Sequence, residues 1–414
     1  MSVIERRAFL KYAGAAALGS GIASWAETHR NDSVAGGDEF PPVDPAEVKV
    51  DAQKLAKAVE FVEAEVKAGS VPGAALVATR RGRKFVEHYC GSYRALTGVD
   101  KPFDNTVSSP LFSFSKGISA TVAVMAHQDG LIEYDVPVSK YIPEFSAGGK
   151  EAITLLHLLT HSAGIPSIAS SAVATEEQWS GFVKKVCAAQ IEWPAGSRTA
   201  YHGISGMFVV AEAVRRVSAM KPWDAICRER LFNPIGAKSF SFGQPPAEFN
   251  VAVAPGYFTS LDPEKNSMSG QPAAGCFGTV DDMLRLLNLV VQNGSWHGRT
   301  LIKPEPLKEM LTVQYAGEIA KAVADDKPPA HEPWGLGWLV RGAAPKCGAG
   351  HWFGFGDSTS PTLFGHAGVD TVYGDGDPAR ELAFVFITTD KARDAAEATR
   401  LRREVSNRLQ DAVI

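Results

Sequence analysis

A serine and a lysine three positions apart are the residues of this 414-residue chain that are best spaced for nucleophilic chemistry. Ser113 and Lys116 open a stretch, residues 111–130, whose apolar positions recur with helical periodicity and which ends at Asp129-Gly130. Residues at i and i+3 share one helical face, so the lysine amine can reach the serine hydroxyl. Unpaired N–H groups at a helix N-terminus favour negative charge beside the serine. The spacing therefore predicts an acyl-transfer nucleophile, Ser113, with Lys116 as a base.

The Ser-x-x-Lys pattern is weak by itself, because a capping serine followed by a chance lysine gives the same spacing. The chain holds a second copy, Ser218 to Lys221. That copy comes at the end of an apolar helical run and is followed at once by Pro222. No helix begins on Ser218, so it has no free N–H groups beneath it and is rejected as a nucleophile.

Two further patterns suggest other hydrolytic chemistries. His157 and His161 have the i, i+4 spacing of metal ligands, but no third ligand stands out. Ser162 lies in Thr-His-Ser-Ala-Gly, which approaches the nucleophile elbow of α/β-hydrolases, although the first glycine is missing and Pro166 blocks the following helix. We expect neither a metal nor a cofactor, and a metallohydrolase remains the alternative that a chelator would test.

The N-terminal residues resemble an export signal. A twin arginine, Arg6-Arg7, is followed by Phe-Leu-Lys and by an apolar run that is too short to remain as a membrane span. We expect a twin-arginine signal peptide over residues 1–26, a linker over residues 27–50 and a periplasmic or secreted protein with no permanent membrane span.

The composition of the chain is that of a globular protein and does not favour nucleic acid as a partner. Hydrophobic residues make up 45% of the chain, enough for a large core, and the net charge of -4 gives no basic footprint for nucleic acid. The five cysteines are scattered without a C-x-x-C pair, which favours buried free thiols, while a disulfide pair stays open.

The order of expected elements predicts an α+β fold. A helix over residues 51–67 precedes strands over 73–78 and 84–89, and the nucleophile helix follows. Residues 133–243 are almost entirely helical in pattern, so we expect a helical subdomain inserted into one domain over residues 51–412. Helix-like and strand-like patterns then follow over residues 279–291, 334–340, 362–364, 370–373, 382–388 and 393–413. The result would be an antiparallel sheet flanked by helices, with a turn at residues 375–378 before the last strand.

Three short sequence motifs occur in this order along the chain and together resemble those of a known family: Ser113-Phe-Ser-Lys116, Tyr201-His-Gly203 and His366-Ala-Gly368. With segments such as ITLLHLLTHSAGIP and WGLGW, the chain from about residue 50 resembles the serine β-lactamase-like and penicillin-binding family, in its class C branch. The resemblance implies the β-lactamase/transpeptidase-like fold and makes Tyr201 a second base, held near ionisation by Lys116.

The resemblance also implies the surroundings of the nucleophile. It places the backbone N–H groups of Ser113 and Val369 around the oxyanion, and it assigns substrate contacts to His366, Gly368 and His202. Penicillin-type members carry lysine where His366 stands, and β-lactamases carry asparagine where Gly203 stands.

We therefore expect a serine hydrolase acting on a small ester or amide, most consistent with a carboxylesterase-type enzyme. The alternatives within the family are a β-lactamase and a D-alanyl-D-alanine carboxypeptidase acting on a cell-wall peptide. The alternative of another class is a non-catalytic penicillin-recognition module, which would not need Ser113, Lys116 and Tyr201 together.

Overall fold

The computed structural model describes residues 40–168, 173–254, 270–343, 354–369 and 371–414. The expected signal peptide and most of the expected linker lie outside the described residues. Residues 40–50 were expected to end that linker, but they pack on the domain. Phe40 and Val43 are buried, residues Pro45–Val48 form a short 3-10 helix, η2, and Val50 pairs with Val413.

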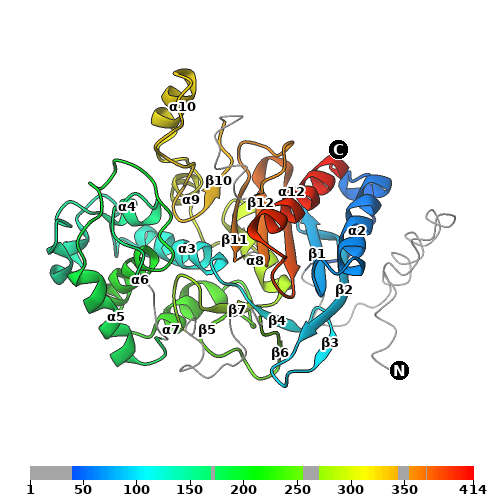
Figure 1. Ribbon diagram of the computed structural model, residues 1–414, viewed down its shortest axis with the longest axis horizontal. Coiled ribbons are helices and arrows are strands. Elements are labelled where there is room, and N and C mark those ends of the chain that lie inside the picture. Colours follow the sequence, from blue (N-terminus) through cyan, green and yellow to red (C-terminus); the bar gives the residue numbers. More distant parts are fainter. Residues whose placement is uncertain (1–39, 169–172, 255–269, 344–353, 370) are drawn as a thin grey trace.

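An antiparallel sheet of seven strands, in the order β10-β11-β12-β13-β1-β2-β3, forms the centre of the domain (Figure 1). Its middle is the pairing of β1 with β13, which runs from Ala74 opposite Thr388 to Arg80 opposite Leu382. The strands are β1 (Gly73–Arg80), β2 (Arg83–Arg94), β3 (Asp100–Pro102), β10 (Leu339–Val340), β11 (Phe364–Gly368), β12 (Val372–Asp377) and β13 (Leu382–Thr388). The expected α+β class is confirmed.

Helices cover both faces of this sheet because successive strand residues point to opposite sides. Ala75 and Val77 of β1 face the core formed with α3 (Phe114–Gln128) and α8 (Val280–Val291). Leu76 of β1 faces the other side, where α2 (Ala52–Lys67) and α12 (Ala395–Ala412) pack side by side (Figure 1). The nucleophile helix and the C-terminal helix therefore lie on opposite faces.

The inserted region is helical, as expected. Between residues 138 and 232, with a gap at 169–172, the named elements that the structure describes are all helices, and α3 lies between them and the sheet (Figure 1). They are η3 (Val138–Lys140), η4 (Pro143–Ser146), α4 (Leu155–Leu159), α5 (Glu176–Ala188), α6 (Ser205–Val217), α7 (Trp223–Cys227) and a π-helical segment, η5 (Arg228–Phe232). Because α3 has neighbours all round, its residues 114–126 are all buried, not only those of one face.

A second, small sheet leads into the nucleophile. Its order is β5-β7-β4-β6, with β4 (Val107–Pro110) ending three residues before Ser113. The sequence pattern did not predict these strands, because each is two to four residues long: β5 (Ser241–Phe242), β6 (Asn250–Val251) and β7 (Cys276–Gly278). The remaining elements are β8 (Ser295–Trp296), β9 (Arg299–Thr300), α9 (Pro304–Met310) and α10 (Ala316–Ala324).

Four expectations near the C-terminus, three strands and a turn, were wrong in their limits. The strand expected over residues 334–340 is reduced to β10, because Gly337 adopts a left-handed conformation. The strands expected over residues 362–364 and 370–373 are β11 and β12, each displaced toward the C-terminus. Asp375 and Asp377 do not form a turn but lie within β12, and the turn follows at Pro378–Arg380.

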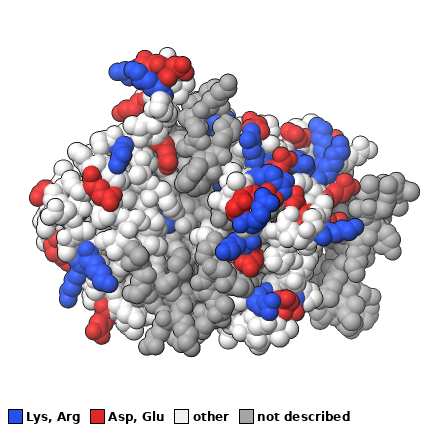
Figure 2. All heavy atoms as spheres, viewed as in Figure 1, with Lys and Arg blue, Asp and Glu red and all other residues white. Residues whose placement is uncertain are grey.

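Charges on the surface are mixed. On the face shown in Figure 2, Lys and Arg residues alternate with Asp and Glu residues, most densely over α12. This agrees with the absence of a basic footprint in the sequence. No helix within the described part of the chain has both the length and the apolar character needed to cross a bilayer.

Candidate active site

Ser113 stands at the N-terminal end of α3, as predicted. Its backbone is already helical, with φ -65° and ψ -13°, and its side chain makes no capping hydrogen bond. The capping interpretation therefore does not describe this serine. Its hydroxyl is left to face the amine of Lys116. The backbone N–H groups of the next three residues donate to the carbonyl oxygens of Leu111, Phe112 and Ser113.

Lys116 is wholly buried beneath the serine. Its Nζ donates to Ser113 Oγ at 3.1 Å and to the carbonyl oxygen of Ala273 at 3.0 Å. Removal of the amine from water lowers the pKa of Lys116 from 10.5 to about 7. The depressed pKa expected from the sequence follows from desolvation, so about half of the amines are neutral at pH 7.

Tyr201 lies beside both residues. Lys116 Nζ is 4.9 Å from the centre of its ring, and its phenol hydrogen-bonds with Ser113. Burial raises the pKa of Tyr201, the Ser113 hydrogen bond opposes this, and the carboxylate of Glu332 adds to the increase. The expectation of a phenol near ionisation was therefore wrong, because desolvation by burial is the largest effect on the pKa of Tyr201.

The oxyanion side of the site joins β11 to the start of α3. Gly368 lies so close to Leu111 that a Cβ there would be 2.3 Å from the Leu111 carbonyl oxygen. Val369 packs in the same cluster as Phe112, and both have left-handed backbones, with φ of 33° and 44°. Such conformations are strained for these bulky residues, and strain of this kind is often stored at functional sites. The structure thus places Val369 against Phe112, the residue before Ser113.

His366 faces the ring of Tyr201 from β11. The two ring centres are 6.2 Å apart, and the side chain is 1% exposed. Its Nδ1 lies 2.7 Å from the carbonyl oxygen of Ala367. Burial lowers the pKa of His366 to about 3, and the charge of Lys116 adds to this. The imidazole is neutral, so it adds no positive charge to the site.

His202 and Gly203 follow Tyr201 in the chain but lie differently. The His202 ring is 2% exposed and parallel to the ring of Trp193, with centres 6.1 Å apart. A direct contact with substrate would need another orientation of this ring. Gly203 donates its N–H to Ser167 Oγ at 3.2 Å, and a Cβ at Gly203 would be 3.1 Å from that oxygen. The Ser167 hydroxyl therefore occupies space that a larger residue at 203 would need.

The residues of the competing sites have structural roles. His157 closes a capping box with Thr154 at the start of α4, and no group of metal-ligating side chains occurs in the described ranges. Ser162 is buried and hydrogen-bonds to Thr160 Oγ1 and to the Tyr315 hydroxyl. Ser218 caps the C-terminal end of α6, as expected from the position of Pro222.

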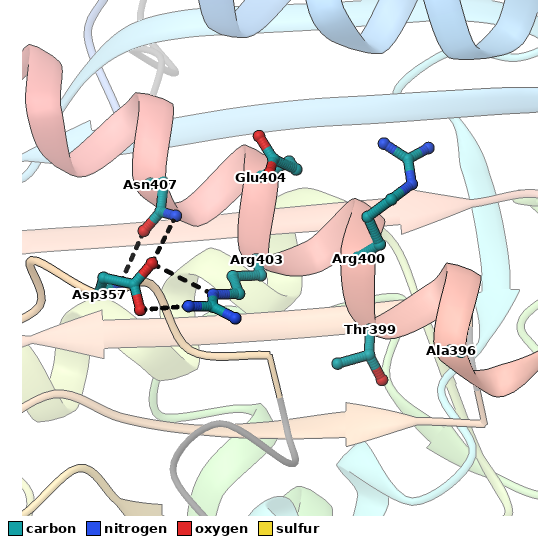
Figure 3. Close-up of a pocket in the computed structure, with 7 residues that line it drawn as sticks. All are labelled: Asp357, Ala396, Thr399, Arg400, Arg403, Glu404 and Asn407. Carbon is teal, nitrogen blue, oxygen red and sulfur yellow. Dashed lines mark hydrogen bonds and ion pairs between the residues drawn. The ribbon is translucent and has the colours of Figure 1, made fainter. Parts of the chain in front are cut away.

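A cavity of about 360 Å³ lies elsewhere, on the outer side of α12 (Figure 3). Its charged residues are already paired. Asp357 pairs with Arg403 at 2.6 Å and accepts from Asn407 at 3.0 Å, while Arg400 pairs with Glu65 and Glu397 outside the cavity lining. Because α12 and α3 are on opposite faces of the sheet, this cavity is separate from Ser113.

The sequence patterns missed two contributors to the site. Trp334 stacks on Tyr201, with ring centres 6.0 Å apart, and its indole N–H donates to Glu332 at 2.8 Å. His161 contacts the Tyr201 ring at 4.7 Å between centres. Its i, i+4 spacing with His157 suggested a metal, and nothing in one sequence indicated that it packs against the tyrosine.

Known proteins are similar to this chain in sequence. The β-lactamase family model matches residues 58–407. The esterase/β-lactamase LipL of Mycobacterium tuberculosis is 31% identical over 150 residues, which cover 36% of this chain and 34% of LipL. A β-lactamase of Providencia stuartii is 21% identical over 237 residues, covering 56% of this chain and 59% of that protein. The chain thus aligns with about a third and three fifths of these relatives.

Solved structures extend the similarity to the whole domain. The crystal structure of a family VIII carboxylesterase superposes with a TM-score of 0.65 at 20% identity, covering 85% of this chain and 98% of the other. At this identity the likeness shows the fold. Together with the match of the family model over most of the chain, it means that this protein belongs to the β-lactamase family, whose members include serine hydrolases.

Proposed function

We propose that this protein is a carboxylesterase-type serine hydrolase that forms an acyl-enzyme on Ser113. One observation carries the proposal: a wholly buried Lys116 holds its amine 3.1 Å from Ser113 Oγ at a pKa of about 7. A serine hydroxyl is a poor nucleophile without a base, and a neutral amine at this distance can accept its proton.

The proposed reaction has two stages. Ser113 Oγ attacks the ester carbonyl carbon while its proton passes to Lys116. The resulting oxyanion accepts hydrogen bonds from the backbone N–H groups of Ser113 and Val369. Each such donor is worth about 3 kcal/mol of the barrier. The neutral phenol of Tyr201 then gives a proton to the leaving alkoxide. Water attacks the acyl-enzyme and gives its proton to the Tyr201 phenolate. The bond from the acyl carbon to Ser113 Oγ then breaks, the protonated Lys116 returns its proton to Ser113 Oγ, and the free acid is released.

An ester suits this site better than a β-lactam. His366 is neutral where penicillin-type members carry a lysine that could attract the β-lactam carboxylate. Gly203 offers no side-chain donor for the acylamide of a β-lactam, and a missing hydrogen bond in a buried site costs about 1–3 kcal/mol. An uncharged ester needs neither contact. The name of the superposed carboxylesterase supports the same substrate class, and the name of LipL includes both an esterase and a β-lactamase.

The test compares kcat/KM for p-nitrophenyl butyrate and nitrocefin on purified protein. We expect the ester to be preferred by at least about thirtyfold, the effect of two lost polar contacts of about 1 kcal/mol or more each. Ser113→Ala should abolish turnover, while Ser218→Ala, the matched serine of the second Ser-x-x-Lys pattern, should leave it unchanged. Equal or faster nitrocefin turnover would contradict the ester preference, and a D-Ala-D-Ala peptide in the same screen tests the carboxypeptidase alternative.

We further propose export by the twin-arginine route. The support is Arg6-Arg7 followed by Phe-Leu-Lys and a short apolar run. Replacing both arginines with lysine should leave unprocessed precursor inside the cell, and the wild-type mature protein should begin near Glu27 outside it. Normal export of the double-lysine variant would refute this route.

A further inference from the structure

His161 holds the chain on both sides of Tyr201. The backbone N–H of Ala200, just before the tyrosine, donates to the carbonyl oxygen of His161 at 2.9 Å. The backbone N–H of His202, just after it, donates to the Nδ1 of His161 at 3.1 Å. One residue, distant in sequence, thus accepts the N–H groups on either side of the proposed proton donor.

The hydrogen bond from His202 also fixes the protonation of the His161 ring. Since Nδ1 accepts a hydrogen bond, it carries no proton, and the proton of the neutral imidazole is on Nε2. Burial lowers the pKa of His161 well below 6.5, and His202, Lys116 and His366 add to this. The acceptor is therefore present throughout the neutral range, because a protonated imidazole has only donors.

The position of His161 is itself constrained. Its φ of 56° is left-handed, which turns the chain sharply after α4. The turn is closed by the N–H of Ser162, which donates to the His157 carbonyl at 2.8 Å, and by the N–H of Gly196, which donates to the Ser162 carbonyl at 2.8 Å. This turn therefore holds the carbonyl oxygen and the Nδ1 of His161 in fixed positions.

The ring of His161 also supports the aromatic ring of Tyr201. It lies 4.7 Å from that ring and 4.5 Å from Trp334, against which it packs edge to face. Trp334 in turn stacks on Tyr201. The phenol is thereby held between two side chains while Lys116 approaches its ring.

We infer that His161 is a positioning residue for Tyr201: its carbonyl oxygen and Nδ1 fix the backbone on both sides of the tyrosine, and its ring fixes the phenol beside Ser113. The inference rests on the proposed function, because it assigns its effect to the step that Tyr201 serves. Misplacing a catalytic group by about 1 Å can cost about a hundredfold in rate.

Two variants separate the acceptor from the other features of His161. His161→Asn and His161→Gly both remove the ring, and both residues tolerate a positive φ. Only asparagine offers a side-chain acceptor near the position of Nδ1. We expect the glycine variant to lose about a hundredfold in kcat on p-nitrophenyl butyrate with little change in KM, and the asparagine variant to recover at least about tenfold of that loss.

The control is His157, whose Nδ1 also accepts a backbone N–H, that of Thr154 at 3.2 Å, in the capping box of α4. His157→Gly and His157→Asn should change the melting temperature and leave kcat within about threefold of wild type. Each His161 change is also made in Tyr201→Phe. If His161 acts through Tyr201, His161→Gly should have little further effect there, because coupled residues are non-additive.

The same variants are compared by the rate at which a fluorophosphonate labels Ser113, a measurement that needs no ester turnover. A wild type that is labelled but hydrolyses no ester refutes the ester proposal and leaves this inference testable by labelling. Wild-type rates of labelling and turnover in His161→Gly, an asparagine variant no better than the glycine variant, or full additivity with Tyr201→Phe would each overturn the inference.

Discussion

Burial of the Lys116 amine destabilises the folded protein, and the size of the effect depends on pH. Folding lowers its pKa from 10.5 to about 7. One pKa unit corresponds to about 1.4 kcal/mol, so at pH 7 the burial costs the folded state about 4 kcal/mol. Between pH 7 and pH 10.5 the unfolded chain binds more protons than the folded chain at this residue. The contribution of Lys116 to the free energy of unfolding therefore becomes more favourable as pH rises across that window.

Lys116→Met tests this reasoning. Methionine has no charge to desolvate, so the cost of about 4 kcal/mol at pH 7 disappears. The variant also loses the hydrogen bond to the Ala273 carbonyl, which leaves a buried acceptor unpaired at a cost of about 1–3 kcal/mol. We expect the variant to be inactive and yet more stable than wild type by about 1–3 kcal/mol at pH 7. By pH 9 that advantage should shrink by about 2 kcal/mol, because the wild type recovers stability.

The assay is urea unfolding of both proteins at pH 7, 8 and 9. Subtracting the unfolding free energy of wild type from that of the variant at each pH cancels the contributions of the other titrating groups, which the two proteins share. Ser113→Ala serves as the control, since it should lose turnover while keeping Lys116 and the pH dependence of wild type. The reasoning is refuted if the difference in unfolding free energy between Lys116→Met and wild type is independent of pH, or if the variant is several kcal/mol less stable at pH 7.

Three further outcomes follow from the site. The value of kcat/KM should rise from acid pH to a plateau, with a midpoint near the Lys116 pKa of about 7, and a midpoint above pH 9 would exclude a depressed lysine as the base. The double variant Lys116→Ala/Tyr201→Phe should be little slower than its slower single variant, and multiplying effects would contradict a shared proton network. Gly368→Ala should lower turnover by about ten- to a hundredfold, because its Cβ would meet the Leu111 carbonyl. Gly181→Ala, at an open position of α5, should not, and equal effects of the two would reject the close approach as the cause.

The helical and strand periods predicted most of the scaffold. The helices α2, α3, α5, α6 and α8 and the strand β13 occur within a few residues of their expected ranges, because each has several turns of helical period or a continuous apolar run. The two- to four-residue strands around β4 have too few residues to show a period, and pairing partners far away in the chain determine them.

The candidate nucleophile, its lysine and the second base could be named from spacing and resemblance, but their protonation could not. The pKa of Lys116 depends on complete burial, and that of Tyr201 on burial and on Glu332, which is 131 positions away in sequence. The bonds of His161 to the residues beside Tyr201 likewise depend on a turn after α4 that returns the chain to the site. A single sequence does not show which residues far apart in the chain lie close together in the folded protein.

The pairing of β1 with β13 has a consequence for how the chain matures. These neighbouring strands in the middle of the sheet are joined through residues that lie about 300 positions apart, as in Ala74 opposite Thr388. Closing so long a loop is entropically costly and slow. During synthesis, β1 has no partner on that side until nearly all of the chain has left the ribosome, so the unpaired backbone N–H and C=O groups of its edge must be kept from pairing with other chains. A pathway that exports only finished, folded molecules would suit such a protein, because the order of synthesis forces its central sheet to be completed last.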